Sequence, residues 1–152
     1  MSIQVGDRAP DFSLSSQTGE TVTLSQFRGK PVVLYFYPKD DTPGCTVEAC
    51  TFRDQYQVFQ DAGAVVIGIS GDSVQSHQRF ATKHNLPFLL LADTQNTVRK
   101  AYGVPNAMLL LPGRVTYTID GEGMVRQVFN SMMDFKAHVD EAIATIRQFS
   151  AA

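Results

Sequence analysis

Apolar positions follow two alternating patterns along most of this chain. Short runs of consecutive β-branched and aromatic residues are typical of buried strands, and apolar residues at helical spacing occupy the segments between the runs. The strands expected from the runs cover residues 32–37, 64–70 and 87–91. The helices expected between and after them cover residues 43–60, 73–84 and 96–102. The apolar side of the first helix is expected to comprise Val47, Phe52, Tyr56 and Phe59.

Two hairpins and a closing helix are expected outside this alternation. The hairpin strands are expected over residues 11–14 with 21–24, and 114–119 with 124–129. The second pair flanks Asp120-Gly-Glu-Gly, a composition typical of tight turns. Ser25 is expected to cap a short helical turn that ends at Gly29, and residues 134–149 have the spacing of an amphipathic helix.

This order of elements predicts an α/β fold. Strands that alternate with helices form parallel β-α-β units, whereas the last hairpin adds antiparallel strands to one edge. A central mixed β-sheet flanked by helices and ending in two strands and a helix is the thioredoxin-like arrangement, here with an additional N-terminal β-hairpin. We expect residues 1–152 to form a single domain, because a chain of this length can bury one sound core.

Charge and composition exclude several classes of function. The 152 residues carry 13 Lys and Arg against 15 Asp and Glu, so a net charge of -2 gives no reason to expect nucleic acid or an anionic membrane as partner. Residues 1–14 lack the apolar core of a secretory signal, and no apolar run approaches the length of a membrane span. We expect a cytoplasmic location, or an organelle if a transit peptide has been removed.

The two cysteines, Cys45 and Cys50, lie in one short segment directly after an expected strand. Thr42 as N-cap and Pro43 as first helical residue form a helix-start signal, which makes Cys45 the third residue of the helix. There, free backbone amides and the positive end of the helix dipole favour a thiolate. A free cysteine is more often a small buried apolar residue, but Gly44 leaves room for a ligand beside the sulfur. The segment therefore predicts a reactive cysteine.

At Pro38-x-x-x-Thr42-x-x-Cys45 the sequence resembles a peroxiredoxin. The longer block Thr42-Pro-Gly-Cys-Thr-Val-Glu-Ala-Cys50 is similar to the peroxiredoxin Q branch, also called the bacterioferritin comigratory protein group. The likeness covers nearly the whole chain and places the active-site arginine of that family at Arg114.

The resemblance implies a thioredoxin-dependent peroxidase that reduces hydrogen peroxide and small organic hydroperoxides without a metal, a haem or a flavin. It makes Cys45 the peroxidatic residue, which becomes a sulfenic acid, and Cys50 the resolving residue, which condenses with it to a disulfide. It gives Arg114 and Thr42 the roles of binding the thiolate and the peroxide, with Pro38 as part of the motif. The partner implied is thioredoxin or a similar dithiol, and the branch implies a monomer.

Helix geometry adds a requirement to that pairing. Five residues along an α-helix separate the Cα atoms of Cys45 and Cys50 by about 8 to 9 Å. A disulfide needs less than about 7 Å. If Cys50 resolves Cys45, the helix between them must therefore unwind locally.

Two other functions remain as alternatives. A general disulfide oxidoreductase on the same fold would be expected to carry Cys-x-x-Cys, which this chain lacks, and would have no use for Arg114. A non-enzymatic redox sensor or chaperone-like protein would react slowly and stoichiometrically. The commoner role of each site residue also stays open: a surface charge for Arg114, a plain N-cap for Thr42 and a buried helix residue for Cys50.

The remaining polar candidates are weaker. The three histidines, His77, His84 and His138, are dispersed without the spacing of a zinc site and are expected at the surface. Glu48 and Arg53 could form an ion pair near the cysteine, or could both be exposed and unpaired. Residues 107–111 depart from the shorter form of the peroxiredoxin Q branch, at the wall of the expected pocket.

Overall fold

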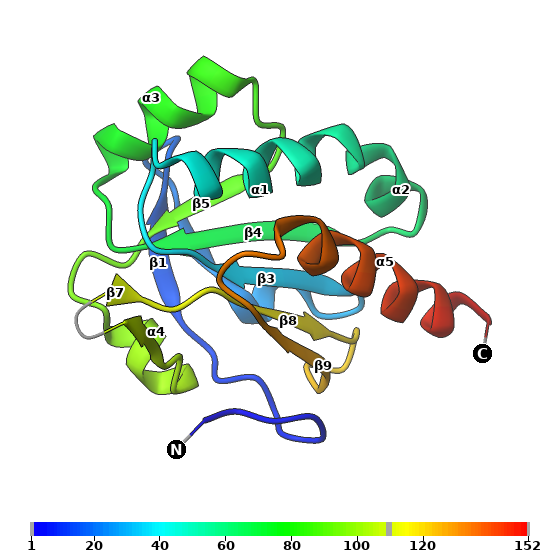
Figure 1. Cartoon of the computed structure of the whole chain (residues 1–152). Coiled ribbons are helices and arrows are strands. Elements are labelled where there is room, and N and C mark those ends of the chain that lie inside the picture. Colours follow the sequence, from blue (N-terminus) through cyan, green and yellow to red (C-terminus); the bar gives the residue numbers. More distant parts are fainter. Residues whose placement is uncertain (1, 109–110, 152) are drawn as a thin grey trace.

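The computed structural model describes residues 2–108 and 111–151. Seven strands form one sheet in the order β2-β1-β5-β4-β3-β8-β9 (Figure 1), and β6 pairs with β7 separately. The strands are β1 (Ser13–Ser16), β2 (Thr21–Thr23), β3 (Val32–Phe36), β4 (Val65–Ser70), β5 (Leu89–Ala92), β6 (Asn106–Met108), β7 (Leu111–Pro112), β8 (Val115–Ile119) and β9 (Val125–Asn130). The helices are η1 (Leu24–Phe27, a 3-10 turn), α1 (Pro43–Asp54), α2 (Tyr56–Asp61), α3 (Val74–His84), α4 (Thr97–Tyr102) and α5 (Phe135–Ala151).

The sheet is mixed, as predicted. Strand β4 pairs in parallel with both β3 and β5, whereas β8 pairs antiparallel with β3 and with β9. The N-terminal hairpin of β1 and β2 joins the same sheet through an antiparallel pairing with β5. This arrangement confirms the thioredoxin-like α/β fold, and it places the carboxyl end of β3, which leads into α1, at a central position of the sheet.

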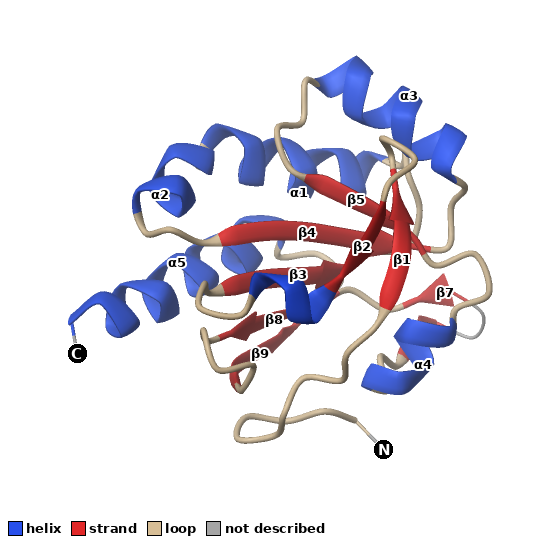
Figure 2. Ribbon diagram, turned by 180° about the vertical axis from the view of Figure 1, so that it is seen from behind, coloured by secondary structure: helices blue, strands red, loops and turns tan. Residues whose placement is uncertain are grey.

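Alternate side chains of β3 enter the two layers of core that the sheet separates. Val33 and Tyr35 face the layer that contains buried residues of α1, α2, α3 and α5. Leu34 and Phe36 face the layer that contains η1, α4 and the N-terminal segment. Figure 2 shows η1 and α4 on the near side of the sheet, with α1, α2 and α5 behind it. Helix α1 thus lies beside α5, which itself packs on β8 and β9.

Three local predictions need correction. The helix expected over residues 43–60 is interrupted at Gln55 (φ -100°, ψ 8°), and α2 begins at the next residue. Val47, expected on the apolar side, is 49% exposed. The short helical turn is capped at Thr23, whose backbone N–H donates to the Gln26 side chain at 2.8 Å, because this glutamine reaches back over the turn. Ser25, the predicted cap, lies inside the turn.

Within the described part of the chain, no helix combines the length and the apolar character needed to cross a membrane.

Candidate active site at the start of helix α1

The first turn of α1 places Cys45 as predicted. Thr42 is the extended N-cap residue (φ -86°, ψ 152°), Pro43 is the first helical residue, and Cys45 is the third. The Cys45 side chain is buried, with 1% exposure. A Cβ on Gly44 would lie 2.8 Å from the Phe135 ring of α5, so glycine is needed for this close approach. The turn that carries the thiol is therefore fixed against α5.

Arg114, directly before β8, is buried beside the thiol and is not a surface charge. Its Nη2 donates to Cys45 Sγ at 3.4 Å, and its Nη1 donates to Glu48 Oε1 at 2.6 Å. Its Nε donates to the Met132 carbonyl at 3.1 Å, and the guanidinium lies 4.9 Å from the centroid of the Phe135 ring. Burial opposes its charge, but Glu48 and Cys45 outweigh burial and raise the pKa of Arg114.

Glu48 belongs to this site, contrary to both alternatives considered from the sequence. Its side chain is fully buried one helical turn after Cys45 and pairs with Arg114. Arg53 instead contacts Asp54 and donates to the His84 carbonyl. Burial raises the pKa of Glu48 from 4.5 to about 7, although Arg114 lowers it. A carboxyl group at the edge of ionisation near neutral pH therefore lies next to the Arg114 guanidinium.

His138 of α5 reaches the same cluster and is fully buried, so the predicted surface position is wrong. Its Nε2 lies 2.7 Å from the Ser131 carbonyl, and its Nδ1 lies 2.7 Å from Thr116 Oγ1. The same Nδ1 lies 3.6 Å from Glu48 Oε2. Burial lowers the pKa of His138 from 6.5 to about 4, so the imidazole is neutral at physiological pH.

Sequence periodicity could have located His138. Helix α5 buries Val139, Ala142, Ile143 and Ile146. His138 falls within this stripe, four residues before Ala142, so helical spacing places it on the buried face. We found no comparable signal for the contact of Arg114 with Glu48, because the two residues lie 66 positions apart.

Thr42 and Pro38 lie in the loop that precedes the thiol. Thr42 occupies the N-cap position as predicted, but its hydroxyl donates to the Lys39 carbonyl at 2.9 Å and does not make the expected side-chain cap bond. The proton of this hydroxyl is not directed at the Cys45 sulfur in this structure. Pro38 follows Tyr37 at the end of β3 and is half-buried.

Cys50 lies on α1 together with Cys45, and both thiols are free. Cys50 is half-buried, whereas Cys45 is buried. Because α1 runs unbroken through both residues, the structure has the helical arrangement in which the two thiols are too far apart to join.

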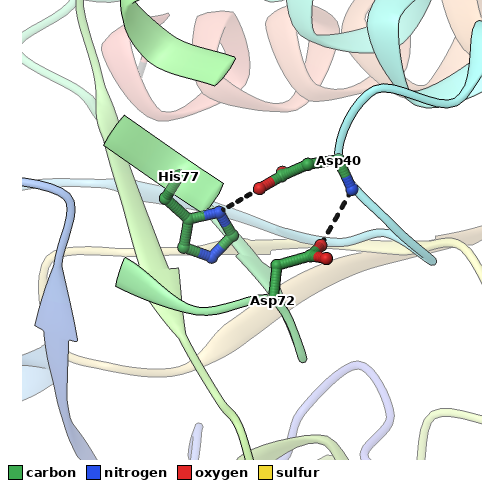
Figure 3. A group of neighbouring side chains, drawn as sticks. All are labelled: Asp40, Asp72 and His77. Carbon is green, nitrogen blue, oxygen red and sulfur yellow. Dashed lines mark hydrogen bonds and ion pairs between the residues drawn. The ribbon is translucent and has the colours of Figure 1, made fainter. Parts of the chain in front are cut away.

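A second polar cluster, Asp40, Asp72 and His77, fixes the loop before α1 (Figure 3). His77 is fully buried, so its predicted surface position is also wrong, and its Nδ1 pairs with Asp40 Oδ2 at 2.7 Å. His77 Nε2 lies 3.0 Å from the Leu91 carbonyl, and Tyr37 donates to Asp40 at 2.6 Å. Asp72 accepts from the Asp40 backbone N–H at 2.8 Å. Since these contacts engage the groups with one another, the cluster acts as an anchor of the loop.

His84, the third histidine expected at the surface, is half-buried at the end of α3. The departure expected at residues 107–111 coincides with β6 and β7, and residues 109–110 lie outside the described part of the chain.

Comparison with known proteins identifies the class of this fold and site. Residues 5–128 match the AhpC/TSA family, and the chain belongs to it. A chloroplastic peroxiredoxin Q of Sedum lineare is 52% identical over 143 residues, which are 93% of this chain and 77% of that protein. The corresponding protein of Arabidopsis thaliana is 50% identical over 95% of this chain and 68% of its own length.

Solved structures agree with this assignment. Peroxidoxin BcpB from Mycobacterium tuberculosis is 40% identical and superposes with a TM-score of 0.90, over 96% of this chain and 97% of that chain. Peroxiredoxin Q of Xanthomonas campestris is 34% identical with a TM-score of 0.84, over 90% of each chain. The resemblance to the peroxiredoxin Q branch is thus confirmed, and these relatives support a thiol peroxidase, an oxidoreductase that acts on peroxides with the help of a reductant.

Proposed function

We propose that the protein reduces hydrogen peroxide and small organic hydroperoxides with Cys45 as the nucleophile. The observation that supports this most is the hydrogen bond from Arg114 Nη2 to Cys45 Sγ at the N-terminal turn of α1. The guanidinium and the helix terminus both favour a thiolate, and the thiolate is the reactive form of cysteine. A bacterioferritin comigratory protein of Xanthomonas campestris, 33% identical, has alkyl peroxide reduction activity, which supports the organic substrates.

In the first step the Cys45 thiolate attacks one oxygen of the peroxide. The O–O bond breaks and an S–O bond forms, so the sulfur is oxidised by two electrons and the peroxide is reduced to water or an alcohol after protonation. Arg114 remains protonated at any relevant pH and stabilises the charge that passes from sulfur to oxygen. Thr42, whose own proton is directed at Lys39, can accept the hydrogen bond of the peroxide O–H. Pro38 restricts the loop beside them.

In the second step Cys50 resolves the sulfenic acid. Its thiolate attacks the Cys45 sulfur, the S–S bond forms, the S–O bond breaks, and the oxygen leaves as water after taking up a proton. Thioredoxin or a similar dithiol then reduces the disulfide and is itself oxidised. This intramolecular cycle requires that α1 unwinds between the two cysteines, for the geometric reason given above.

We further propose that the chain acts as a single-domain monomer without metal or organic cofactor. The setting proposed is the cytoplasm, with an organelle as the alternative that the chloroplastic plant relatives support. Sedimentation of the reduced protein tests the monomer, since a mass of twice the chain would contradict it.

The decisive experiment is peroxide-dependent oxidation of NADPH through thioredoxin and its reductase. We expect the wild type to consume many equivalents of peroxide, and Cys45→Ser to consume none above background. Full turnover by Cys45→Ser would refute the assignment of the nucleophile. Slow, stoichiometric consumption by the wild type would favour a redox sensor. Normal recycling by Cys50→Ser would show that the catalytic cycle needs Cys45 alone.

A further inference from the structure

Glu48 lies on α1 within the segment that must unwind for Cys45 to meet Cys50. Its carboxyl group is fully buried, and Oε1 accepts from Arg114 at 2.6 Å. Oε2 has no hydrogen-bond donor among the described residues. One oxygen of this carboxyl group therefore accepts a hydrogen bond and the other does not. Leaving an oxygen without a donor in the protein interior is costly when the group is ionised.

The environment of Oε2 points to a neutral acid. A carbonyl oxygen only accepts, so His138 Nε2 carries the proton that bonds the Ser131 carbonyl. The neutral ring then presents the lone pair of Nδ1, which accepts from Thr116 Oγ1 and lies 3.6 Å from Glu48 Oε2. Nδ1 therefore offers no proton to Oε2, so an ionised Oε2 has no donor there to compensate its burial.

The other titratable groups around Glu48 come from each element packed on it. Arg114 is the cation, Cys45 is on the same helix, and Tyr35 of β3 has a buried hydroxyl whose pKa is raised by burial first and by Glu48 second. Against the attraction of Arg114, loss of hydration raises the pKa of Glu48 from 4.5 to about 7. Burial and the lack of a donor for Oε2 thus both favour the neutral acid.

We propose that Glu48 is a positioning residue that times the resolving step: as a neutral acid it keeps α1 closed against Arg114 and His138, and as a carboxylate it releases the segment from Cys45 to Cys50. This inference rests on the proposed function, because it concerns the step in which Cys50 attacks the sulfenic acid. It adds a pH-dependent group to that step beyond the two reacting sulfur atoms.

The direction of the pH effect on α1 follows from the difference in the pKa of Glu48 between the closed and the open helix. Unwinding of α1 exposes Glu48 to water, where its pKa returns toward the ordinary 4.5 from about 7 in the closed helix. The closed form binds the proton more tightly, so it is favoured at low pH and loses this advantage as the pH rises through 7. With these two pKa values, the equilibrium constant for opening of α1 increases by roughly 20-fold from about pH 5.5 to pH 8. An uncharged residue at position 48 would not contribute this increase.

The test compares wild type with Glu48→Gln, an uncharged group of the same shape that mimics the neutral acid at every pH. The protein is mixed with one equivalent of hydrogen peroxide, quenched with acid over a time course, and analysed by intact mass. Gain of one oxygen reports the sulfenic acid, and its conversion to a disulfide gives the resolving rate separately. The reactivity of the Cys50 thiol also rises with pH, but it does so in both proteins, so the ratio of their resolving rates isolates Glu48.

We expect the ratio of wild-type to Glu48→Gln resolving rates to rise by about 20-fold from about pH 5.5 to pH 8. The matched control is Glu141→Gln, which removes an exposed carboxyl on α5 and is expected to leave the pH dependence unchanged. A ratio that stays constant within roughly twofold overturns the proposal. If the wild type forms the sulfenic acid but no Cys45–Cys50 disulfide at any pH, the proposed resolving mechanism fails instead.

A second measurement needs no variant at Glu48. Hydrogen exchange of the reduced wild type, corrected for intrinsic exchange, gives the opening equilibrium of α1 with α3 as internal reference. We expect protection of residues 46–50, whose amides bond within α1, to fall relative to α3 as the pH rises through 7. Protection of the two helices that changes in parallel would refute the role of Glu48 even if Glu48→Gln did not fold.

Discussion

Replacing Arg114 by methionine tests how the site is held together. The guanidinium makes three hydrogen bonds, to Cys45, Glu48 and the Met132 carbonyl. Methionine fills similar space without a donor, so Glu48 is left buried with neither carboxylate oxygen paired. Breaking a buried ion pair on one side costs about 3–5 kcal/mol, a large share of the roughly 5–15 kcal/mol that stabilises a typical domain.

The stability that Arg114→Met loses increases as the pH rises. Arg114 lowers the pKa of Glu48, so without it the pKa rises above its present value of about 7. Near pH 5.5 Glu48 is then neutral and Arg114→Met loses hydrogen bonds only, each worth about 0.5–1.5 kcal/mol. Near pH 8 the full cost of breaking the ion pair applies, because Glu48 is then either an unpaired buried charge or must be protonated at the expense of folding free energy. We expect Arg114→Met to fold, with a deficit that grows as the pH rises.

The double variant Arg114→Met with Glu48→Gln separates stability from catalysis. It contains no buried charge, so we expect it to recover at least about 2 kcal/mol relative to Arg114→Met near pH 8. The peroxide step should not recover. Loss of a donor that stabilises charge in the transition state slows a reaction by about 100- to 1,000-fold, and both variants lack that donor.

Urea unfolding followed by far-ultraviolet circular dichroism measures the stabilities, since the chain has no tryptophan to report by fluorescence. Rapid acid quench and intact mass give the rate of sulfenic acid formation. A double variant no more stable than Arg114→Met would contradict the buried pair as the cause. A peroxide rate within about threefold of wild type in either variant would contradict the catalytic role of Arg114.

Three further predictions concern the cysteines and the histidine. Cys50→Ser should complete one fast turnover and, under excess peroxide, gain sulfinic acid at Cys45 by intact mass, because nothing competes with the second peroxide. Formation of the disulfide in the wild type should reduce helical circular dichroism and hydrogen-exchange protection over residues 42–53, and full protection in the disulfide form would refute the unwinding argument. His138 has a pKa lowered from 6.5 to about 4, so the stability that depends on its neutral form is lost as the pH falls through this window. The titration of Glu48 opposes this effect, so the measurement uses Glu48→Gln. Urea unfolding of this variant should show about 1 kcal/mol less stability near pH 5.5 than near pH 8. Equal stabilities at the two pH values would contradict the buried neutral imidazole.

Local patterns predicted the order of the strands in the main sheet, but not the pair β6 and β7 or the separate helix α2. Apolar runs predicted β3, β4 and β5, and the Thr42-Pro43 pair located the start of α1 and hence the position of Cys45 in its first turn. These features depend on neighbours in sequence, through strand burial and helix capping. The interruption at Gln55 escaped the same reasoning because the apolar spacing continues past it into α2.

The contacts of the site depend on neighbours in space. Glu48 meets Arg114 because β8 lies beside β3 and brings residue 114 under α1, and no local signal specifies that pairing. The Thr42 hydroxyl was expected to cap the helix, but its bond to the Lys39 carbonyl depends on the conformation of the loop. The surface positions predicted for His77 and His138 are wrong because both residues lie on the buried faces of their helices, whereas histidine on average is more exposed.

The packing of α1 indicates where its unwinding stops. Phe52 is fully buried, and its ring stacks on Tyr35 at a centroid distance of 4.6 Å. Exposing a phenylalanine costs about 1.5–3 kcal/mol, so the helix has reason to stay folded from Phe52 onward. Between Pro43 and Cys50, the buried side chains are those of Cys45, Glu48 and Ala49, which hold little apolar area.

Unwinding that ends before Phe52 therefore exposes two small apolar groups and one carboxyl group, and the carboxyl is the part that gains hydration. The apolar cost is the same at every pH, whereas the gain of Glu48 in water increases once it ionises. The resolving step is accordingly controlled by the protonation of one buried acid, and the aromatic core that holds the rest of α1 needs no rearrangement.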